Sequence, residues 1–318
     1  MQRYLARRLV QLVPQLLILF TLSFALVHLT PGATGAVDVQ SVSPENLAAL
    51  RQQLGLDRPL YVQFGDWLWR LVRLDFGASF IDGQPVRAKI AERLPATLLL
   101  TGTALALSVL IAVPLGIVTS LYRNSAFDYL LTIFAFLGVS IPAFWAALLA
   151  IVVFGVQLRW FPVQGMRTVG QPVASPTLDL LRHLALPALV FGLEGTAALT
   201  RFVRSSMSEV LTEDYVRTAR AKGLSERVVL TRHALKNALL PLVTLIGLRL
   251  PALVGGTVLL ETVFAWPGIG RLGWEAVVRR DYPIVMGLVV CTGLLTILGN
   301  LLADIAYAVI DPRIKLEG

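Results

Sequence analysis

The side chains that usually carry out enzyme chemistry are few in this sequence and stand far apart. The histidines are His28, His183 and His233, and the single cysteine is Cys291, so neither a His/Cys metal site nor an intrachain disulfide is expected. The phosphate loop GxxxxGK[ST], the zinc motif HExxH, the CxxC pair and the nucleophile elbow GxSxG do not occur. We therefore expect a chain that has no catalytic, cofactor-binding or metal-ligating residues and is not an enzyme on its own.

Three ionisable residues lie inside long apolar runs, namely Glu194, Arg249 and Asp304. Such groups are costly in lipid and normally face a water-filled cavity or a partner. Glu194 and Arg249 could form an ion pair, contact a second subunit or line a polar pathway, and the sequence leaves these alternatives open. Asp304 stands near the end of the last apolar run, so we expect its side chain to reach the membrane interface.

The densest group of charges stands at residues 201–241, which hold eight Lys or Arg and four Asp or Glu between two apolar runs. Leu211, Tyr215 and Ala219 follow one another at intervals of four, which predicts an apolar stripe along a short helix. Gly223 can adopt the left-handed geometry that ends a helix, and the serine two residues later can cap the next one. We therefore predict two short helices joined by a turn.

Three interpretations of this basic hairpin compete. A DNA-binding helix-turn-helix would use a similar element, but the flanking apolar runs leave almost no linker with which a recognition helix could reach a groove. A basic hairpin that touches lipid head groups is the second interpretation. The third, which we favour, is a rigid element that couples the chain to a cytoplasmic protein.

The composition indicates the elements that must position this hairpin. Of the 318 residues, 56% are hydrophobic and 15% are charged, against about 25% charged residues in a typical soluble domain. Apolar runs of about 20 residues indicate spanning helices, and their continuity argues against the alternating strands of a barrel. We therefore predict an all-α integral membrane protein with six transmembrane helices, at 9–29, 97–121, 129–156, 184–200, 239–260 and 284–310, of which the fourth is the weakest.

The distribution of charge predicts the orientation of the chain. Arg3, Arg7 and Arg8 precede the first apolar run, and the next basic residue is Arg51, which places the N-terminus in the cytoplasm. Six spans then return the tail 311–318 to the same side. The net charge of +8 is thus explained by topology without a nucleic-acid partner. A cleaved signal peptide is the alternative for the first run, but its apolar core exceeds the usual 7–15 residues.

A segment of mixed charge, residues 30–96, separates the first two predicted spans and is expected on the outer side. Residues 59–74 are predicted to form an amphipathic helix that contains Trp67 and Trp69. Those tryptophans favour an interfacial anchor or the core of a small lid over a ligand site. The predicted domains are therefore 1–96, the first span with this helical outer segment; 97–310, the main transmembrane domain; and the short tail.

The hairpin carries a recognisable motif. Arg217-Thr218-Ala219-x3-Gly223 resembles the EAA-x3-G loop of ABC importer permeases, although Arg217 replaces the Glu and Thr218 replaces the first Ala of that motif. The Leu-Pro that the general motif has thirteen residues after its Gly is also displaced, because Lys236 stands at the Pro position and the proline is Pro241. The longer stretches DYVRTARAKG and RHALKNALLP resemble the B-type permease subunit of dipeptide, oligopeptide and nickel importers. Further stretches typical of that family are LGLDRPLYVQF (54–64), DFGASF (75–80), ERLPATL (92–98), RSSMSEVL (204–211), ETVFAWPGIGRL (261–272), RRDYPIV (279–285) and DPR (311–313).

The resemblance implies a type I ABC importer permease fold in the bacterial cytoplasmic (inner) membrane. It implies a heterodimer with a second, C-type permease, two cytoplasmic ATPases that bind ATP and Mg²⁺, and an extracytoplasmic binding protein. The coupling helix would span 213–227. Its expected ATPase contacts are Tyr215, Arg217, Thr218, Ala219, Arg220, Ala221, Lys222, Gly223, Leu224 and Ser225, and the expected residues of a gate-like turn are Phe264, Trp266, Pro267, Gly268 and Gly270.

The resemblance favours di- and oligopeptides as substrates, while nickel, glutathione or another small solute remains an alternative. An ion-driven secondary transporter is the alternative from another class. Inverted repeats are common in such transporters, and the basic hairpin has no counterpart in the first half of this sequence. The absence of a convincing ion-binding cluster argues in the same direction. The sequence does not predict whether 30–96 contacts the binding protein.

Overall fold

The computed structural model describes residues 2–29, 58–123, 125–126, 128–131, 133, 140–239, 242, 245–246 and 258–310. Within these ranges the chain forms helices joined by turns, with one isolated antiparallel bridge between Ala78 and Pro85. The all-α class is therefore confirmed. The elements are α1 (Gln2–Leu29), α3 (Leu60–Val72), α4 (Val86–Leu121), α6 (Ala143–Ala150), the π-helix η1 (Ile151–Gln157), α7 (Pro176–Val210), α8 (Asp214–Ala221), α9 (Glu226–Val228), the π-helix η2 (Val229–Ala234), α11 (Val258–Val263), α12 (Ile269–Val278) and α13 (Tyr282–Ile310).

Three of the described helices are long and apolar enough to cross a membrane: Val86–Leu121, Pro176–Val210 and Tyr282–Leu301. They contain the second and fourth predicted spans and most of the sixth. The first predicted span falls within α1, and the third includes α6 and η1 but also residues outside the described ranges. Most of the fifth, 239–260, lies outside the described residues, so six spans remain a prediction.

The fourth span is much longer than its apolar run of 184–200 predicted. Helix α7 begins eight residues earlier because Ser175 caps it, with its hydroxyl accepting a hydrogen bond from the Leu178 amide at 3.4 Å, and Pro176 occupies the first turn. The helix then continues through Pro187 and the charged residues beyond 200 until Val210. Hydropathy alone detects only the apolar middle of such a helix. The part beyond residue 200, called here the polar stalk of α7, carries no such signal.

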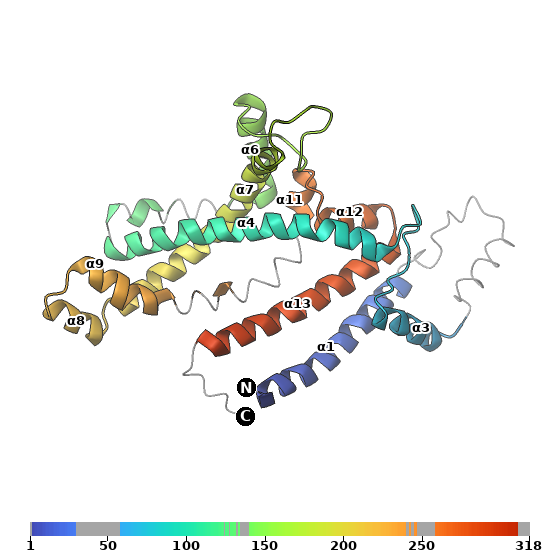
Figure 1. The fold of residues 1–318 in the computed structure, drawn as a ribbon, viewed down its shortest axis with the longest axis horizontal. Helices are drawn as coiled ribbons and strands as arrows, with labels where there is room; N and C mark the ends of the chain where they lie inside the picture. The colour runs from blue at the N-terminus through green and yellow to red at the C-terminus, as the bar shows by residue number, and fades with distance from the viewer. Residues whose placement is uncertain are drawn as a thin grey trace.

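Helices α4 and α7 form the central pair and cross in the middle of the molecule (Figure 1). Small residues bring their backbones close together. A Cβ added to Gly116 would lie 2.6 Å from the Val203 side chain, and one added to Gly192 would lie 3.0 Å from the Ala104 carbonyl oxygen. The Ser108 hydroxyl also donates to the Gly192 carbonyl. This is the small-residue packing expected between membrane helices, where lipid supplies no hydrophobic driving force for association.

Helix α13 packs along α1, and α12 joins this pair to the start of α4 (Figure 1). Helix α3 lies against the far end of α1, where the rings of Phe20 and Phe24 contact Phe64 and Trp67 at centroid distances of 5.2 to 6.1 Å. The two predicted anchor tryptophans thus differ, because Trp67 packs on α1 whereas Trp69 is 59% exposed.

The directions of the long described helices agree with the predicted topology, in which α4, α7 and α13 run one way and α1 runs the other (Figure 1). The C-terminal ends of α4, α7 and α13 and the N-terminal end of α1 point toward the side that carries α8 and α9 (Figure 1). Helix α3 and the α12–α13 corner lie toward the opposite side. The hairpin that contains α8 and α9 is therefore at one end of the molecule and the described part of the outer segment is near the other.

Candidate coupling site

The candidate coupling site is the hairpin formed by residues 211–239, which follows α7 directly. Helix α8 ends in a Schellman motif, in which the Leu224 amide donates to the Ala219 carbonyl at 3.4 Å and the Gly223 amide to the Arg220 carbonyl at 2.9 Å. The φ angle of Gly223 is +75°, which confirms the predicted left-handed helix end. A Cβ added there would meet nothing within 4 Å, so the chain itself leaves the space over Gly223 open.

The two arms of the hairpin pack on each other through small apolar side chains. Val216 and Ala219 of α8 are 0% and 3% exposed and lie against Val229, which is also fully buried. The apolar stripe therefore runs through Val216. Tyr215, which the spacing placed on that stripe, is 40% exposed, and its hydroxyl accepts a hydrogen bond from Asn237 Nδ2 at 3.0 Å.

The second arm is anchored on α7. Ala234 and Ala238 are fully buried against Met207, and the Ser206 hydroxyl donates to the Ala238 carbonyl at 2.8 Å. Part of this arm, η2, has the wider turn of a π-helix, a local distortion that is frequent at functional sites. Because buried contacts join both arms to α7, a displacement of α8 must move the end of α7 with it.

An ion pair closes the open end of the hairpin. Arg220 donates from Nε to Glu226 Oε2 at 3.1 Å and from Nη2 to Oε1 at 2.6 Å. This hydrogen-bonded pairing lowers the pKa of Glu226 below its usual value. Ser225 occupies the predicted N-cap position of α9, but its side chain makes no capping hydrogen bond in this described turn. The Arg220–Glu226 fork therefore links α8 to the start of α9.

The predicted ATPase contacts gather on the outside of the hairpin, with one exception. The exposed ones are Tyr215, Arg217, Thr218, Arg220, Ala221, Lys222, Gly223, Leu224 and Ser225. Ala219 faces the inside and packs on Val229. The exposed end combines basic side chains with the apolar Leu224, which is 40% exposed. Such a surface can bind a groove that offers carboxylates around an apolar centre.

A further ion pair lies at the base of the hairpin. Arg204 near the end of α7 donates from Nη2 to Asp128 Oδ2 at 2.7 Å, and the Asp128 side chain is only 3% exposed. Asp128 lies in a helical stretch a few residues after the end of α4, so this contact joins that stretch to the last turns of α7. Asp128 is the buried member of this pair, so removal of Arg204 would be costly because it would take a charged partner from a buried carboxylate.

Two family descriptions match this chain. Residues 1–101 match the N-terminal part of the binding-protein-dependent transport system membrane component, and residues 112–316 match the binding-protein-dependent transport system inner membrane component. The chain belongs to this family.

Relatives of this inner membrane component cover its whole length. It is 47% identical to a putative peptide permease protein of Brucella suis biovar 1 over 99% of this chain and 100% of the relative. It is 41% identical to the oligopeptide transport system permease protein AppB of Bacillus subtilis, with the same coverage. It is 39% identical to the dipeptide transport system permease protein DppB of Alkalihalophilus pseudofirmus, again over 99% and 100%.

The fold has a counterpart among solved structures. A chain of the MetNI methionine ABC transporter, in an inward-facing conformation, superposes with a TM-score of 0.54 at 17% identity, covering 70% of this chain and 96% of that one. At this identity the likeness concerns the fold alone. It supports the type I ABC importer permease fold for this inner membrane component.

The predicted gate-like turn is an ordered, buried connection between α11 and α12. Phe264 and Trp266 are 2% and 0% exposed, and the Trp266 indole donates to the Ala96 carbonyl at 2.8 Å. Pro267 is half-buried in the same turn, and Gly268 and Gly270 are buried. The irregular backbone expected from these residues is present, and in the described chain it packs against α4.

The turn packs over Glu261 of α11, a fully buried carboxyl group that sequence reasoning did not single out. Its Oε1 accepts from the Thr97 hydroxyl at 2.7 Å, and its Oε2 accepts from the Arg271 amide at 2.9 Å. Gly268 is required here because a Cβ at that position would lie 2.3 Å from the carboxylate. The Glu261 side chain thus sits at the N-terminal end of α12, where it accepts from one of the amides that the helix itself leaves unpaired.

The three ionisable residues predicted within the spans lie either on the surface of α7 or where the structure describes no side chain. Glu194 is exposed on the surface of α7, so it faces lipid, a partner or a pathway in the assembled protein. Arg249 lies outside the described residues, and with it the predicted pairing. Asp304 lies on α13, but its side chain is likewise outside the described set.

Proposed function

We propose that this chain is the membrane-spanning subunit of an ATP-driven importer for di- and oligopeptides, and that it forms half of the translocation path. The hairpin 211–239 would bind one of two cytoplasmic ATPases. A second, related permease would form the other half of the path, and an extracytoplasmic binding protein would deliver the peptide. The names of relatives that match along the whole chain support the peptide substrate.

One observation carries the coupling role: an exposed, basic hairpin is joined by buried contacts to a helix long enough to cross the membrane. The Schellman turn at Gly223 and the Arg220–Glu226 fork hold the shape of the exposed end. Ser206 and Met207 fix its second arm on α7. A movement of the bound ATPase that displaces α8 would therefore move α7 as a rigid body. The reason is that packed interfaces switch between discrete arrangements and do not deform continuously.

The membrane orientation follows from the same assignment. The hairpin must lie in the cytoplasm to meet an ATPase. The helix directions described above then place both termini there as well, in agreement with the arginines that precede the first span. Helix α3 and the α12–α13 corner would face the outside, on the side from which a binding protein arrives. ATP and Mg²⁺ would be held by the ATPases.

Copurification and uptake test this proposal. The tagged chain, expressed with its neighbouring genes, should copurify with a second permease and an ATPase pair. Proteoliposomes that contain the complex and the loaded binding protein should hydrolyse ATP and accumulate labelled di- or oligopeptide. Uptake driven by an ion gradient without any ATPase would refute the proposal. Uptake of nickel or glutathione but not of peptides would keep the importer and refute its substrate.

A further inference from the structure

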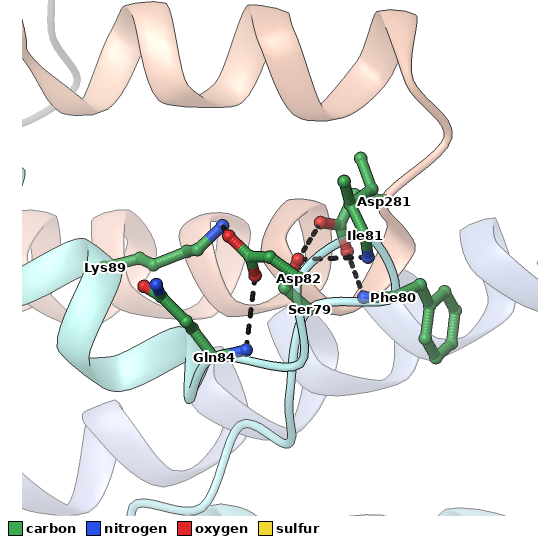
Figure 2. Close-up of polar contacts among 7 residues, drawn as sticks. All are labelled: Ser79, Phe80, Ile81, Asp82, Gln84, Lys89 and Asp281. Atoms are coloured by element: carbon green, nitrogen blue, oxygen red, sulfur yellow. Dashed lines mark hydrogen bonds and ion pairs between the residues drawn. The ribbon is translucent and has the colours of Figure 1, made fainter.

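A buried aspartate joins two segments that lie about 200 residues apart in the sequence. The outer turn, residues 76–85 between α3 and α4, lies against Asp281, the residue that precedes α13 (Figure 2). Asp281 is 1% exposed. Its Oδ2 accepts from the Ser79 hydroxyl at 2.5 Å and its Oδ1 accepts from the Phe80 amide at 3.1 Å. Hydrogen bonds to an ionised carboxylate are among the stronger ones in proteins, particularly away from water.

The outer turn also closes on itself. The Ser79 amide donates to the Gln84 carbonyl at 2.9 Å, and the Gly83 amide donates back to the Ser79 carbonyl at 3.0 Å. Gly83 has a φ of +67°, a conformation that few other residues adopt. Asp281 therefore bonds a closed loop from outside, and its two hydrogen bonds hold that loop closed against the α12–α13 corner.

The turn leads directly into the packed outer end of the membrane domain. Val86, the first residue of α4, is fully buried in a cluster with Ile284 and Leu288 of α13. A Cβ on Gly287 would lie 2.5 Å from Val86 Cγ1, so α13 and α4 leave no room between them here. The outer turn, the start of α4 and the α12–α13 corner are consequently joined as one unit.

The geometry points to a positioning role for Asp281: it fixes the outer turn to the α12–α13 corner, so that events at the outer face move α4 and α13 together. This inference rests on the proposed function, because it concerns how a signal from the binding protein reaches the spans. The α12–α13 corner, which contains Asp281, lies at the opposite side of the molecule from the coupling hairpin (Figure 1). Its loss should therefore impair stimulation by the binding protein and leave basal ATP hydrolysis intact.

The first test measures hydrogen exchange in the assembled complex. In Asp281→Ala, the amides of Ser79 and Gly83 should exchange roughly 10- to 100-fold faster, because the turn loses its charged acceptor. These amides bond within the turn and not to Asp281, so their faster exchange would show that the turn itself opens when the Asp281 bonds are lost. Wild-type exchange at both amides would overturn the inference.

Asp82 provides a matched control on the same turn. Its carboxylate pairs with Lys89 at 2.5 Å and accepts from the Gln84 amide at 3.2 Å, but it is exposed, and such surface contacts contribute little to stability (Figure 2). The hydrogen bond from Lys89 lowers the pKa of Asp82, so this control is charged at neutral pH. Asp82→Ala should leave both reporter amides within about threefold of wild type. An equal response of the two alanine variants would mean that any carboxylate on the turn suffices, against the inference.

The second test compares ATP hydrolysis with and without loaded binding protein. Asp281→Ala should keep the basal rate and lose most of the stimulation, and Asp281→Asn should recover part of it, because its amide oxygen can still accept from the Phe80 amide. Ser79→Ala removes only the hydroxyl and tests the same contact if Asp281→Ala does not assemble. Full stimulation of Ser79→Ala and Asp281→Ala overturns the inference. A wild-type chain that brings down no ATPase refutes the proposed function instead.

Discussion

Replacement of Gly223 tests the coupling site most directly. We expect Gly223→Asp to reach the membrane in normal amount but to lose both transport and coupled ATP hydrolysis. The φ angle of +75° makes any side chain strained, at a cost of about 1–2 kcal/mol, and somewhat less for Asn or Asp. This cost is local and exposed, since a Cβ at Gly223 meets nothing within 4 Å in the chain. The fold should therefore survive.

The same geometry predicts the order of effects in a series of variants at this position. If strain in the turn dominated, Gly223→Ala would be the most severe and Gly223→Asn the mildest, because Asn tolerates the left-handed region. If the open space is filled by the ATPase, bulk decides and the order is reversed. We expect the second order, with Gly223→Ala retaining much of its activity and both Asn and Asp losing most of it.

The assay is ATP hydrolysis and peptide uptake by reconstituted complexes, with the amount of chain in the membrane measured on the same samples. Copurified ATPase gives the affinity of the site separately from its turnover. Normal uptake by Gly223→Asp would refute the coupling site. Loss of the chain from the membrane would refute the claim that the strain is local, and Ala being worse than Asn would show that backbone strain decides.

Three further predictions concern packing and charge. Gly116→Ala should lower the free energy of unfolding by about 1–3 kcal/mol, because the added methyl group overpacks α4 against α7. Gly102→Ala in the same helix should not lower it, because a Cβ there would meet nothing within 4 Å. Thermal unfolding in detergent compares the two variants. Gly268→Ala should be at least as destabilising in that measurement, because its Cβ would lie 2.3 Å from a buried carboxylate. The Arg220–Glu226 pair lowers the pKa of Glu226. The stabilisation that the pair gives to the hairpin is therefore complete above the ordinary glutamate pKa and is lost as the pH falls through the lowered pKa. ATPase binding should weaken over this acid range in the wild type, and Arg220→Gln should lack this weakening.

The sequence predicted the helical class and the turn of the hairpin because both depend on local patterns. Apolar runs located the second, fourth and sixth spans, and Gly223 ended α8 as a left-handed glycine. The prediction that Tyr215 lies on the buried apolar stripe of α8 was wrong, because a spacing of four also suits a residue at the edge of a helix face. The buried contact between the two arms is made by Val216 and Val229 instead. The length of α7 was missed because its polar stalk carries no hydropathy signal.

Pairings between distant motifs could not be predicted. Thr97 and Glu261 belong to two stretches that the sequence marked as typical of the family, and so do Ser79 and Asp281, but nothing in either stretch identifies its partner. A carboxylate in a charged-looking motif is usually solvated, and only tertiary packing shows that these two are buried. Covariation between such pairs is the signal that would have found them.

These buried polar contacts are distributed in a way that bears on the mechanism. Thr97–Glu261 and Ser79–Asp281 lie toward the end of the molecule opposite the hairpin, whereas Ser206–Ala238 and Arg204–Asp128 lie toward the hairpin. Between these two sets, small residues let α4 and α7 approach closely at Gly116 and Gly192, and the Ser108 hydroxyl donates across the pair to the Gly192 carbonyl. The buried polar contacts at the two ends resist separation of the segments that they join. Small-residue packing between them allows the two helices to stay close while they shift together. The α4–α7 pair is therefore suited to carry a movement of the hairpin across the membrane as one body, and the Gly116 and Asp281 variants would interrupt that movement at different points.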